Sequence, residues 1–274
     1  MYESYWNLTQ KPFENTPDPR FYYPGESYQS ALLKLRYAVE SRRGGALLAG
    51  PSGSGKTLLL NMLRDALDEE LTPFVHLVFP QMTPAELLAY LADKLGGPEQ
   101  RNGHPAGVSG SVQRIERFLA ENAREGRHAV VAVDEAHLID DAESFEALRL
   151  LLNFSADGGQ GMTLLLVGQT GLLPTMDRIP QLEERLAVKS LLRPFSEDET
   201  AAYVAHRLKV AGASRAIFEP EATPALWALS RGVARRINRL CDLALLIGYA
   251  EERRSLSAEH LEAVSEELVA VVPE

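Results

Sequence analysis

The feature that most constrains this 274-residue chain is one glycine-rich run, Gly50-Pro51-Ser52-Gly53-Ser54-Gly55-Lys56-Thr57. An apolar run at 45–49 precedes it and a helix-like segment at 58–67 follows it. This spacing between a strand and a helix predicts a phosphate-binding P-loop. The glycines let backbone N–H groups turn inward around phosphates, and the N-terminus of the following helix adds partial positive charge. A chance glycine-rich turn is the alternative, and the flanking strand and helix argue against it.

Each part of the run has a predicted role. Lys56 is expected to reach the β- and γ-phosphates of a nucleotide, and the hydroxyl of Thr57 is expected to bind Mg²⁺. The residues expected to contact the nucleotide are Gly50, Pro51, Ser52, Gly53, Ser54, Gly55, Lys56, Thr57 and Leu58.

A second motif places two carboxylates directly after an apolar strand. Residues 130–133 are apolar, and Asp134 and Glu135 follow them. Ligands of open parallel sheets bind at the carboxyl ends of the strands. We therefore expect Asp134 to hold Mg²⁺, as a Walker B aspartate does, and Glu135 to orient and polarise the attacking water. A solvated acidic turn is the alternative.

The same stretch, Asp134-Glu135-Ala136-His137, also spells a helicase-type box. Such helicases need two nucleotide-binding sheet domains, and this chain supplies one. His137 is interpreted as a residue at a helix N-terminus rather than a metal ligand, because no Cys/His cluster of zinc spacing accompanies it.

Composition is that of an ordinary soluble protein. The chain is 45% hydrophobic and 24% charged, with a net charge of -10, so it is not a basic nucleic-acid coat as a whole. Its one cysteine, Cys241, is expected to be a buried, inert thiol. No apolar stretch reaches the ~18–20 residues of a membrane span and no signal peptide is visible. We expect a cytoplasmic protein, which partners could hold at the cytoplasmic face of the inner membrane.

Strands and helices alternate along the first two thirds of the chain. This alternation predicts an α/β fold with a five-stranded parallel sheet sandwiched by helices. The predicted strands are 45–49, 74–79, 128–133, 162–167 and 187–192, and the intervening helices are 27–41, 58–67, one opening at Thr83-Pro84, 111–125 and 145–154. Residues 96–110 are expected to form an exposed loop.

From Pro194 onward only helices are expected, at 196–211, 224–230, 233–251 and 257–269. The predicted domains are therefore an aromatic and proline-rich arm at 1–28 packed on the core, an α/β domain at 29–193, and an all-helical domain at 194–274.

Three further polar residues are candidates for catalysis. Gln169 follows the fourth strand and is expected to lie between the two motifs, where it would bond the γ-phosphate or the water; a polar strand cap is the alternative. Arg185 precedes the fifth strand and would serve as an arginine finger in trans, or pair with Glu183 or another carboxylate on its own surface. Arg235 lies in the most basic stretch, 231–240, at a helix start, where a positive charge is favourable only beside an anion, and it would contact phosphate; a solvated or DNA-facing basic face is the alternative.

Together these motifs resemble an AAA+ ATPase, and further segments resemble the ExeA-like family linked to general (type II) secretion. Those segments are Trp6-Asn7-Leu8, Lys11-Pro12-Phe13, Thr16-Pro17-Asp18-Pro19-Arg20-Phe21, Tyr22, Leu148-Arg149-Leu150-Leu151-Leu152-Asn153, Val167-Gly168-Gln169 and Arg235-Arg236-Ile237-Asn238. The lid motif of the family usually has proline before its arginine. Ala234 stands there in this chain, so Arg235 and Arg236 both remain candidates.

The resemblance implies an AAA+ P-loop NTPase with a helical lid that hydrolyses ATP with Mg²⁺ as a homo-oligomer. It also implies nucleotides at subunit boundaries, a lid arginine that reports nucleotide state, and a protein partner in secretion or envelope assembly. A DNA-binding ATPase clamp of the transposition-regulator type is the alternative, favoured by the basic 231–240 stretch and by Arg42-Arg43 and disfavoured by the acidic total. The ATPase module would act as an oligomeric motor or as an assembly switch that hydrolyses slowly and binds a partner. A monomeric P-loop kinase is a further alternative, but a kinase requires neither Arg185 nor the C-terminal helices.

Overall fold

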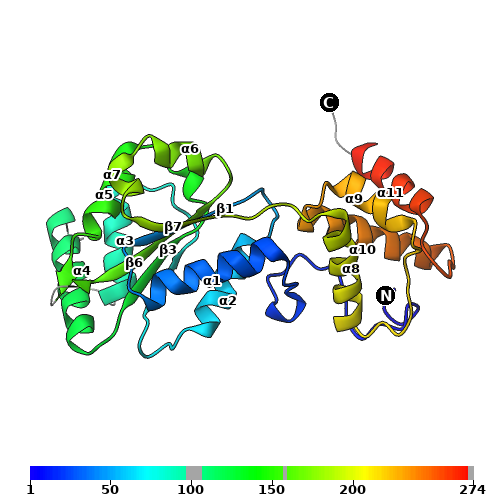
Figure 1. Cartoon of the computed structure of the whole chain (residues 1–274), viewed down its shortest axis with the longest axis horizontal. Helices are drawn as coiled ribbons and strands as arrows, with labels where there is room; N and C mark the ends of the chain where they lie inside the picture. The colour runs from blue at the N-terminus through cyan, green and yellow to red at the C-terminus, as the bar shows by residue number, and fades with distance from the viewer. Residues whose placement is uncertain (97–106, 157–158, 271–274) are drawn as a thin grey trace. The chain divides into compact units, whose positions relative to one another are not determined.

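The computed structural model describes residues 1–96, 107–156 and 159–270, and Figure 1 shows the path of the chain. The described residues form two compact units. One contains residues 27–50 and 59–192 and is called the sheet unit; the other contains 1–26, 51–58 and the chain from Arg193 onward and is called the helical unit.

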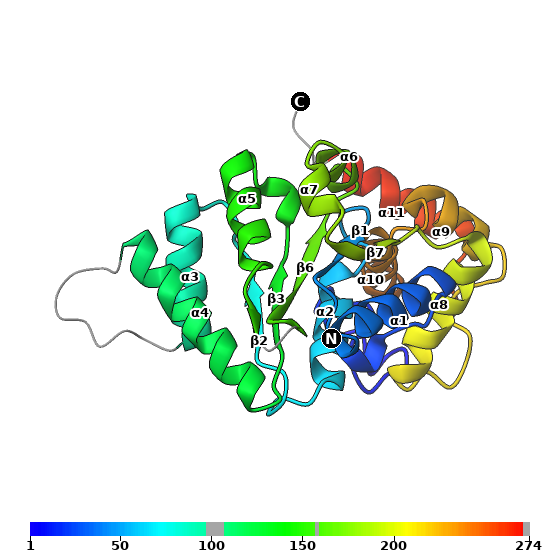
Figure 2. The ribbon, with the colours of Figure 1, turned by 60° about the vertical axis from the view of Figure 1, so that its left-hand side comes forward.

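The sheet unit is built on a five-stranded sheet in the order β2-β3-β6-β1-β7, in which every pairing is parallel. The predicted five-stranded parallel sheet is confirmed, and Figure 2 shows the strands side by side in this order. The strands are β1 Gly45–Ala49, β2 Phe74–Leu77, β3 Ala129–Val133, β6 Met162–Gly168 and β7 Leu186–Leu191. A short antiparallel pair, β4 Ser155–Ala156 with β5 Gly159–Gln160, was not predicted.

The three inner strands β3, β6 and β1 are buried along their whole length, which explains their unbroken apolar sequences. Their register aligns Val133 with Leu166 and Ala49 with Gly168, so all three end at the same edge of the sheet. The residues that follow these strands are therefore brought to one edge.

Helices cover both faces of the sheet. The helices that belong wholly or largely to this unit are α1 Glu26–Glu40, α2 Lys56–Ala66, α3 Pro84–Gly96, α4 Val108–Arg124, α5 Ala142–Leu151, α6 Leu172–Asp177 and α7 Pro180–Glu183. Alternate strand residues pack with α3 to α7 in one apolar core, whereas α1 and α2 lie over the opposite face (Figure 1).

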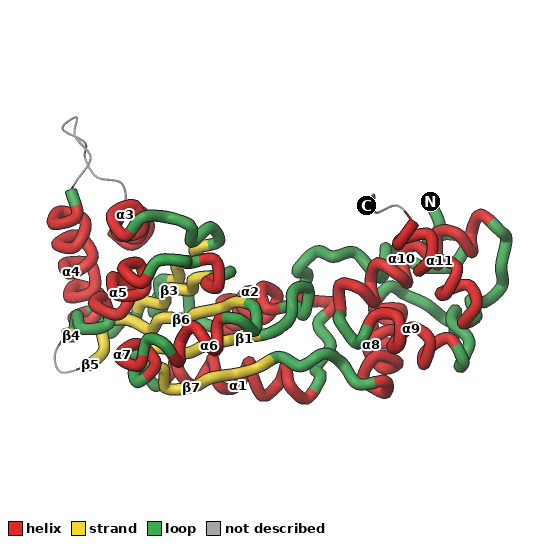
Figure 3. Tube along the Cα trace, turned by 90° about the horizontal axis from the view of Figure 1, so that it is seen from above, coloured by secondary structure: helices red, strands yellow, loops and turns green. Residues whose placement is uncertain are grey.

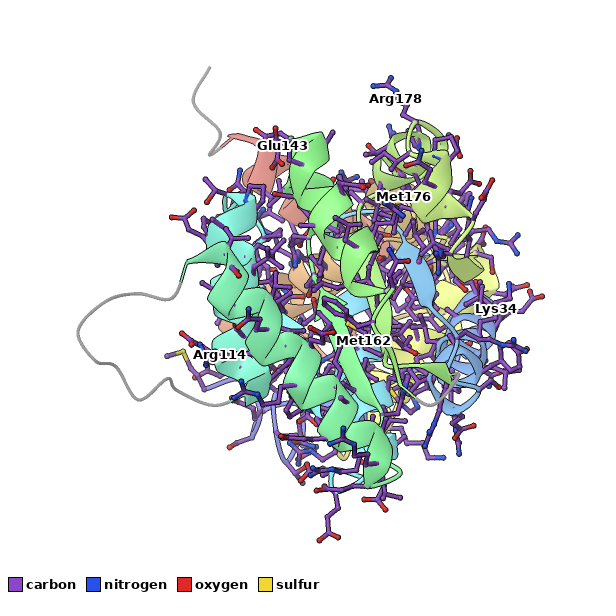
Figure 4. All side chains as sticks on the ribbon, turned by 90° about the vertical axis from the view of Figure 1, so that its left-hand side faces the viewer. Lys34, Arg114, Glu143, Met162, Met176 and Arg178 are labelled. Atoms are coloured by element: carbon purple, nitrogen blue, oxygen red, sulfur yellow. The ribbon has the colours of Figure 1, made fainter. Side chains whose placement is uncertain are left out.

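Figure 4 shows Met162 and Met176 inside this core and Arg178 projecting away from it. Arg114 on α4 donates to Asp93 on α3 at 2.8 Å. Helix α4 begins three residues earlier than the predicted start at Ser111, and the short helices α6 and α7 were not predicted. Most of the predicted 96–110 loop lies outside the described residues.

The helical unit contains α8 Glu197–Val210, α9 Ala222–Ser230, α10 Ala234–Ala250 and α11 Ala258–Ala270, close to their predicted bounds. Figure 3 shows helices and loops in the described chain beyond β7. Helix α8 opens with a complete capping box between Ser196 and Glu199. Cys241 is buried in α10, and burial raises the pKa of its thiol well above the usual value.

The N-terminal arm, predicted to pack on the core, belongs by its contacts to the helical unit. Trp6 is fully buried and its Nε1 donates to the carbonyl of Leu245 on α10 at 2.9 Å. The guanidinium of Arg207 on α8 donates to the carbonyls of Pro12 at 2.5 Å and Glu14 at 3.0 Å, and it lies 4.6 Å from the ring centroid of Phe21. Aromatic burial and a buried cation thus fix the arm to α8 and α10.

Within the ranges that the structure describes, no helix is both long and apolar enough to cross a membrane.

His128, directly before β3, makes stability depend on pH. It is 5% exposed, Nε2 lies 2.9 Å from the hydroxyl of Thr163, and burial, with Arg42 adding repulsion, lowers its pKa from 6.5 to about 4. Between pH 6.5 and about 4, His128 is protonated in the unfolded chain and neutral in the folded chain. The free energy of unfolding therefore has the full contribution of neutral His128 above pH 6.5, and this contribution falls by up to about 3 kcal/mol as the pH drops towards 4.

Urea unfolding of wild type and His128→Gln between pH 4 and 8 measures this contribution. We expect the variant, whose amide can still donate to Thr163 but does not titrate, to lose most of this fall. An equally steep fall in the variant would assign the acid sensitivity to other groups.

Candidate active site

The glycine-rich run forms a tight loop after β1. Gly53 and Gly55 have φ values of +77° and +89°, which side-chain-bearing residues rarely adopt, and the N–H of Ser54 donates to the carbonyl of Pro51 at 3.2 Å. Just before the loop turns, the N–H of Gly50 donates to the carbonyl of Gly168 at 3.2 Å, which anchors the loop to the end of β6. These left-handed glycines are required for backbone N–H groups to face an anion.

Lys56 is the first residue of α2 and folds back over the loop. It is 5% exposed, and its Nζ donates to the carbonyl of Pro51 at 3.0 Å. A buried ammonium group at a helix N-terminus gives the loop two sources of positive potential, which fits a phosphate chain.

Arg235 closes the other side of the loop. Its backbone N–H donates to the carbonyl of Gly53 at 3.0 Å, and a Cβ built at Gly53 would lie 2.5 Å from the Cβ of Arg235 and 3.3 Å from its Nε. The N–H of Arg236, by contrast, bonds the carbonyl of Val233 within its own turn. The loop therefore contacts Arg235, which favours it over Arg236 as the lid arginine.

Asp134 follows β3 and is held on both oxygens. It is 2% exposed, its Oδ1 accepts from the N–H of Glu135 at 2.9 Å, and its Oδ2 lies 3.3 Å from Nε2 of His76 on β2. His76 was not singled out from the sequence, although a polar residue inside an otherwise apolar run was a signal that could have drawn attention to it.

Glu135 has a strained backbone at φ +51° and ψ 32°. Non-glycine residues in the left-handed region cost of order 1–3 kcal/mol and cluster at functional sites. The side chain is 41% exposed, but its Oε2 atom is buried without a hydrogen-bond partner, 3.4 Å from Nδ1 of His137. A carboxylate with an unsatisfied oxygen is poised to accept a proton or a water.

Gln169 follows β6, which lies between β3 and β1 in the sheet. It thus leaves the sheet between the strands that lead to Asp134 and to Gly50, as the sequence predicted. Its backbone N–H donates to Nδ1 of His137 at 3.3 Å. His137, interpreted from sequence as a helix N-terminal residue, is the second residue of the short 3₁₀ helix Ala136–Leu138. Its Nδ1 also lies 3.4 Å from Oε2 of Glu135.

Arg185 lies at the opposite edge of the sheet, directly before β7, whose first residue Leu186 aligns with Gly45. The five residues of β1 separate this edge from Gly50 by about 16 Å. The side chain of Arg185 donates to Oδ1 of Asn153 at 2.9 Å, whereas Glu183, the expected alternative partner, pairs with Lys189. Arg185 is therefore placed away from the edge where β1, β3 and β6 end.

Asp134 in the sheet unit and Thr57, the second residue of α2, each carry oxygen atoms of the kind that Mg²⁺ prefers. Among the residues that the structure describes, no group of three or more His, Cys, Asp or Glu side chains could hold a metal ion. Magnesium is commonly held by one or two carboxylates together with substrate phosphates, and the single carboxylate of Asp134 fits that mode.

A family model described as "AAA domain" matches residues 39–176. General secretion pathway protein A of Aeromonas hydrophila is 34% identical over 253 residues, which cover 91% of this chain and 45% of that protein. The chain thus spans less than half the length of this relative.

Solved structures share the fold at low identity. The Aeropyrum pernix ORC2 protein in its ADPNP–ADP complexes is 19% identical with a TM-score of 0.67, covering 94% of this chain and 71% of that one. Cdc6p from Pyrobaculum aerophilum is 15% identical with a TM-score of 0.68, covering 99% and 74%. The RuvB branch migration motor of Thermotoga maritima is 19% identical with a TM-score of 0.61, covering 94% and 74%.

From its P-loop, its carboxylate-tipped β3 and these likenesses, the chain belongs to the AAA domain family of P-loop NTPases, as an ExeA-like member similar to general secretion pathway protein A.

Proposed function

We propose that this chain binds ATP with Mg²⁺ in its glycine-rich loop and hydrolyses it to ADP and phosphate as part of a homo-oligomer. The observation that carries the proposal is the loop itself: two left-handed glycines, a buried Lys56 and the Arg235 backbone bonded to Gly53. Family membership and a structural neighbour determined with ADPNP and ADP support the choice of nucleotide.

In binding, the loop N–H groups and Lys56 hold the β- and γ-phosphates, and Arg235 adds a positive charge from the start of α10. Asp134 and Thr57 would hold Mg²⁺. That ion would neutralise charge on the phosphates, and the bonds from Glu135 N–H and His76 fix the orientation of the Asp134 carboxylate.

In hydrolysis, Glu135 accepts the proton of the attacking water, and its left-handed backbone sets the direction of its side chain. Gln169 leaves the sheet between the two motifs and donates its side-chain amide to the γ-phosphate or to the water. Most of the rate enhancement comes from positioning and from neutralising charge on the transferred phosphoryl group.

Arg185 contributes to the site of a neighbouring copy. Its own loop begins about 16 Å away at the other end of β1, a greater distance than an arginine side chain spans. In a homo-oligomer, Arg185 can face the γ-phosphate bound by the next subunit even though it lies far from the P-loop of its own chain. Such trans arginines are worth about 10³–10⁵ in rate.

The relative from Aeromonas hydrophila is named for general secretion. We propose that the hydrolysis cycle drives or times the assembly of a protein partner in secretion or the cell envelope, with the ATPase located at the cytoplasmic face of the inner membrane through that partner. DNA is the second candidate partner, favoured by Arg231, Arg236 and Arg239, which are exposed and form no ion pair in the described chain. Turnover raised by duplex DNA at low salt, and not at high salt, would favour DNA.

Glu135→Gln should bind ATP with an affinity within about threefold of wild type and lower turnover by about 10²–10⁴, because its amide cannot accept a proton. Fluorescent-nucleotide titration and phosphate release measure the two quantities. Glu143→Gln, which changes an exposed carboxylate on α5, is the matched control. Normal turnover in Glu135→Gln would remove Glu135 from catalysis.

Arg185→Ala should retain ATP binding but lose at least about 10³-fold in turnover, and mixing it with Glu135→Gln should restore activity. Each mixed interface can join an intact Glu135 from one copy with an intact Arg185 from the other. Arg178→Ala, an exposed arginine nearby, is the control. Arg185→Ala turnover equal to wild type at every protein concentration would exclude the shared site.

Arg235→Ala should weaken ATP binding by about tenfold, the value of one charge-assisted contact, whereas Arg236→Ala should change it by less than about twofold. Both variants remove one charge from α10, so equilibrium titration of the pair isolates position from charge. Equal losses would indicate a general basic field instead of one lid arginine.

A further inference from the structure

His137 is contacted by two of the groups to which catalysis has been assigned. Its Nδ1 lies 3.3 Å from the backbone nitrogen of Gln169 and 3.4 Å from Oε2 of Glu135. The imidazole is largely buried, with 16% of its side chain exposed. One ring nitrogen therefore faces a hydrogen-bond donor and a carboxylate oxygen at the same time.

The end of β6 leaves room for this ring. A Cβ added at Gly168 would lie 3.3 Å from Nδ1 of His137 and 3.1 Å from its backbone nitrogen, tighter than most real Cβ contacts. Gly168 also accepts the hydrogen bond from Gly50 that anchors the P-loop. The strand end is thus shaped around His137 at the point where the loop is attached.

A neutral imidazole nitrogen carries either a lone pair or a proton. The N–H of Gln169 requires a lone pair on Nδ1, whereas an ionised Glu135 requires a proton there. Both needs cannot be met together. Oε2 of Glu135 is buried without a hydrogen-bond partner, so the structure has the arrangement in which Gln169 holds Nδ1.

We propose that His137 is a positioning residue that makes Gln169 and Glu135 compete for Nδ1. While the Gln169 N–H bonds Nδ1, Glu135 is released and can accept the proton of water. When the Gln169 backbone moves away, the ring proton passes from Nε2 to Nδ1 through solvent, with no net gain or loss, and Nδ1–H holds the Glu135 carboxylate. The phosphate-sensing strand end thereby controls the general base, and this inference rests on the proposed ATPase function.

Two substitutions separate this role from a structural one. Asparagine presents a donor and an acceptor together, so His137→Asn can hold Glu135 permanently; we expect kcat to fall about tenfold with KM for ATP within about twofold. His137→Ala cannot hold Glu135, and we expect it to retain a higher kcat than His137→Asn. A purely structural histidine gives the reverse order, with Ala the more damaging substitution, and that result would overturn the proposal.

Leu138→Ala changes an exposed side chain in the same turn and is the control for damage to the turn. Thermal unfolding of all three variants identifies any loss that comes from misfolding. Gly168→Ala, which should displace the ring, is expected to shift kcat without a matching change in KM. Wild-type kcat in Gly168→Ala would contradict the placement of the ring.

A measurement independent of turnover tests the arrangement itself. In nucleotide-free protein with ¹⁵N-labelled histidine, His137 should show the Nε2–H tautomer with an unprotonated Nδ1, assigned by loss of the signal in His137→Asn. Glu135→Gln, whose amide can donate, should shift the Nδ1 signal, and Glu143→Gln should not. An Nδ1–H tautomer or an unshifted signal would refute the inference even with ATPase activity intact, whereas an inactive wild type would refute the ATPase and leave this readout standing.

Discussion

Parallel strand pairing is the constraint on which the rest of the structure depends. Because β1, β3 and β6 run in the same direction and end in register, Gly50, Asp134 and Gln169 all leave the sheet at one edge. The three strands are buried on both faces, so contact with water on one face does not select the register of their pairing. Register is held instead by packing of alternate residues against α3 to α7, so the placement of residues at this edge depends on that core.

The sequence predicted the elements whose signals are local. Buried strands read as apolar runs and the helix starts as caps, so all five strands and the main helices were found within a few residues. The short helices α6 and α7 lack such signals because six and four residues carry too little periodicity. Motif spacing named Lys56, Asp134 and Glu135, but it could not choose between Arg235 and Arg236, which required the approach of α10 to Gly53. His76 and His137 were missed as partners since their contacts depend on strand pairing across long sequence separations.

The helical unit joins two distant parts of the chain through one helix. Helix α10 places the backbone of Arg235 on Gly53 at its start, and its later turns accept the indole of Trp6 at Leu245. A continuous hydrogen-bonded helix transmits displacement along its axis with little internal change. The N-terminal arm, fixed also by Arg207, is thus bonded to the same helix that contacts the P-loop.

The two edges of the sheet carry groups with different expected partners: those at the carboxyl edge would act within one copy of the chain, and Arg185 at the amino edge would act on another copy. The carboxyl edge collects Asp134, Glu135 and Gln169, and His137 places one ring nitrogen within reach of the last two. The amino edge carries Arg185, bonded to a neutral asparagine rather than to a carboxylate. An arginine held by a neutral side chain keeps its full charge for an anion, and the length of β1 separates it from the loop of its own copy. Under the proposed function, a charge so placed would act on phosphate only where another copy presents its carboxyl edge, so that hydrolysis would depend on oligomerisation.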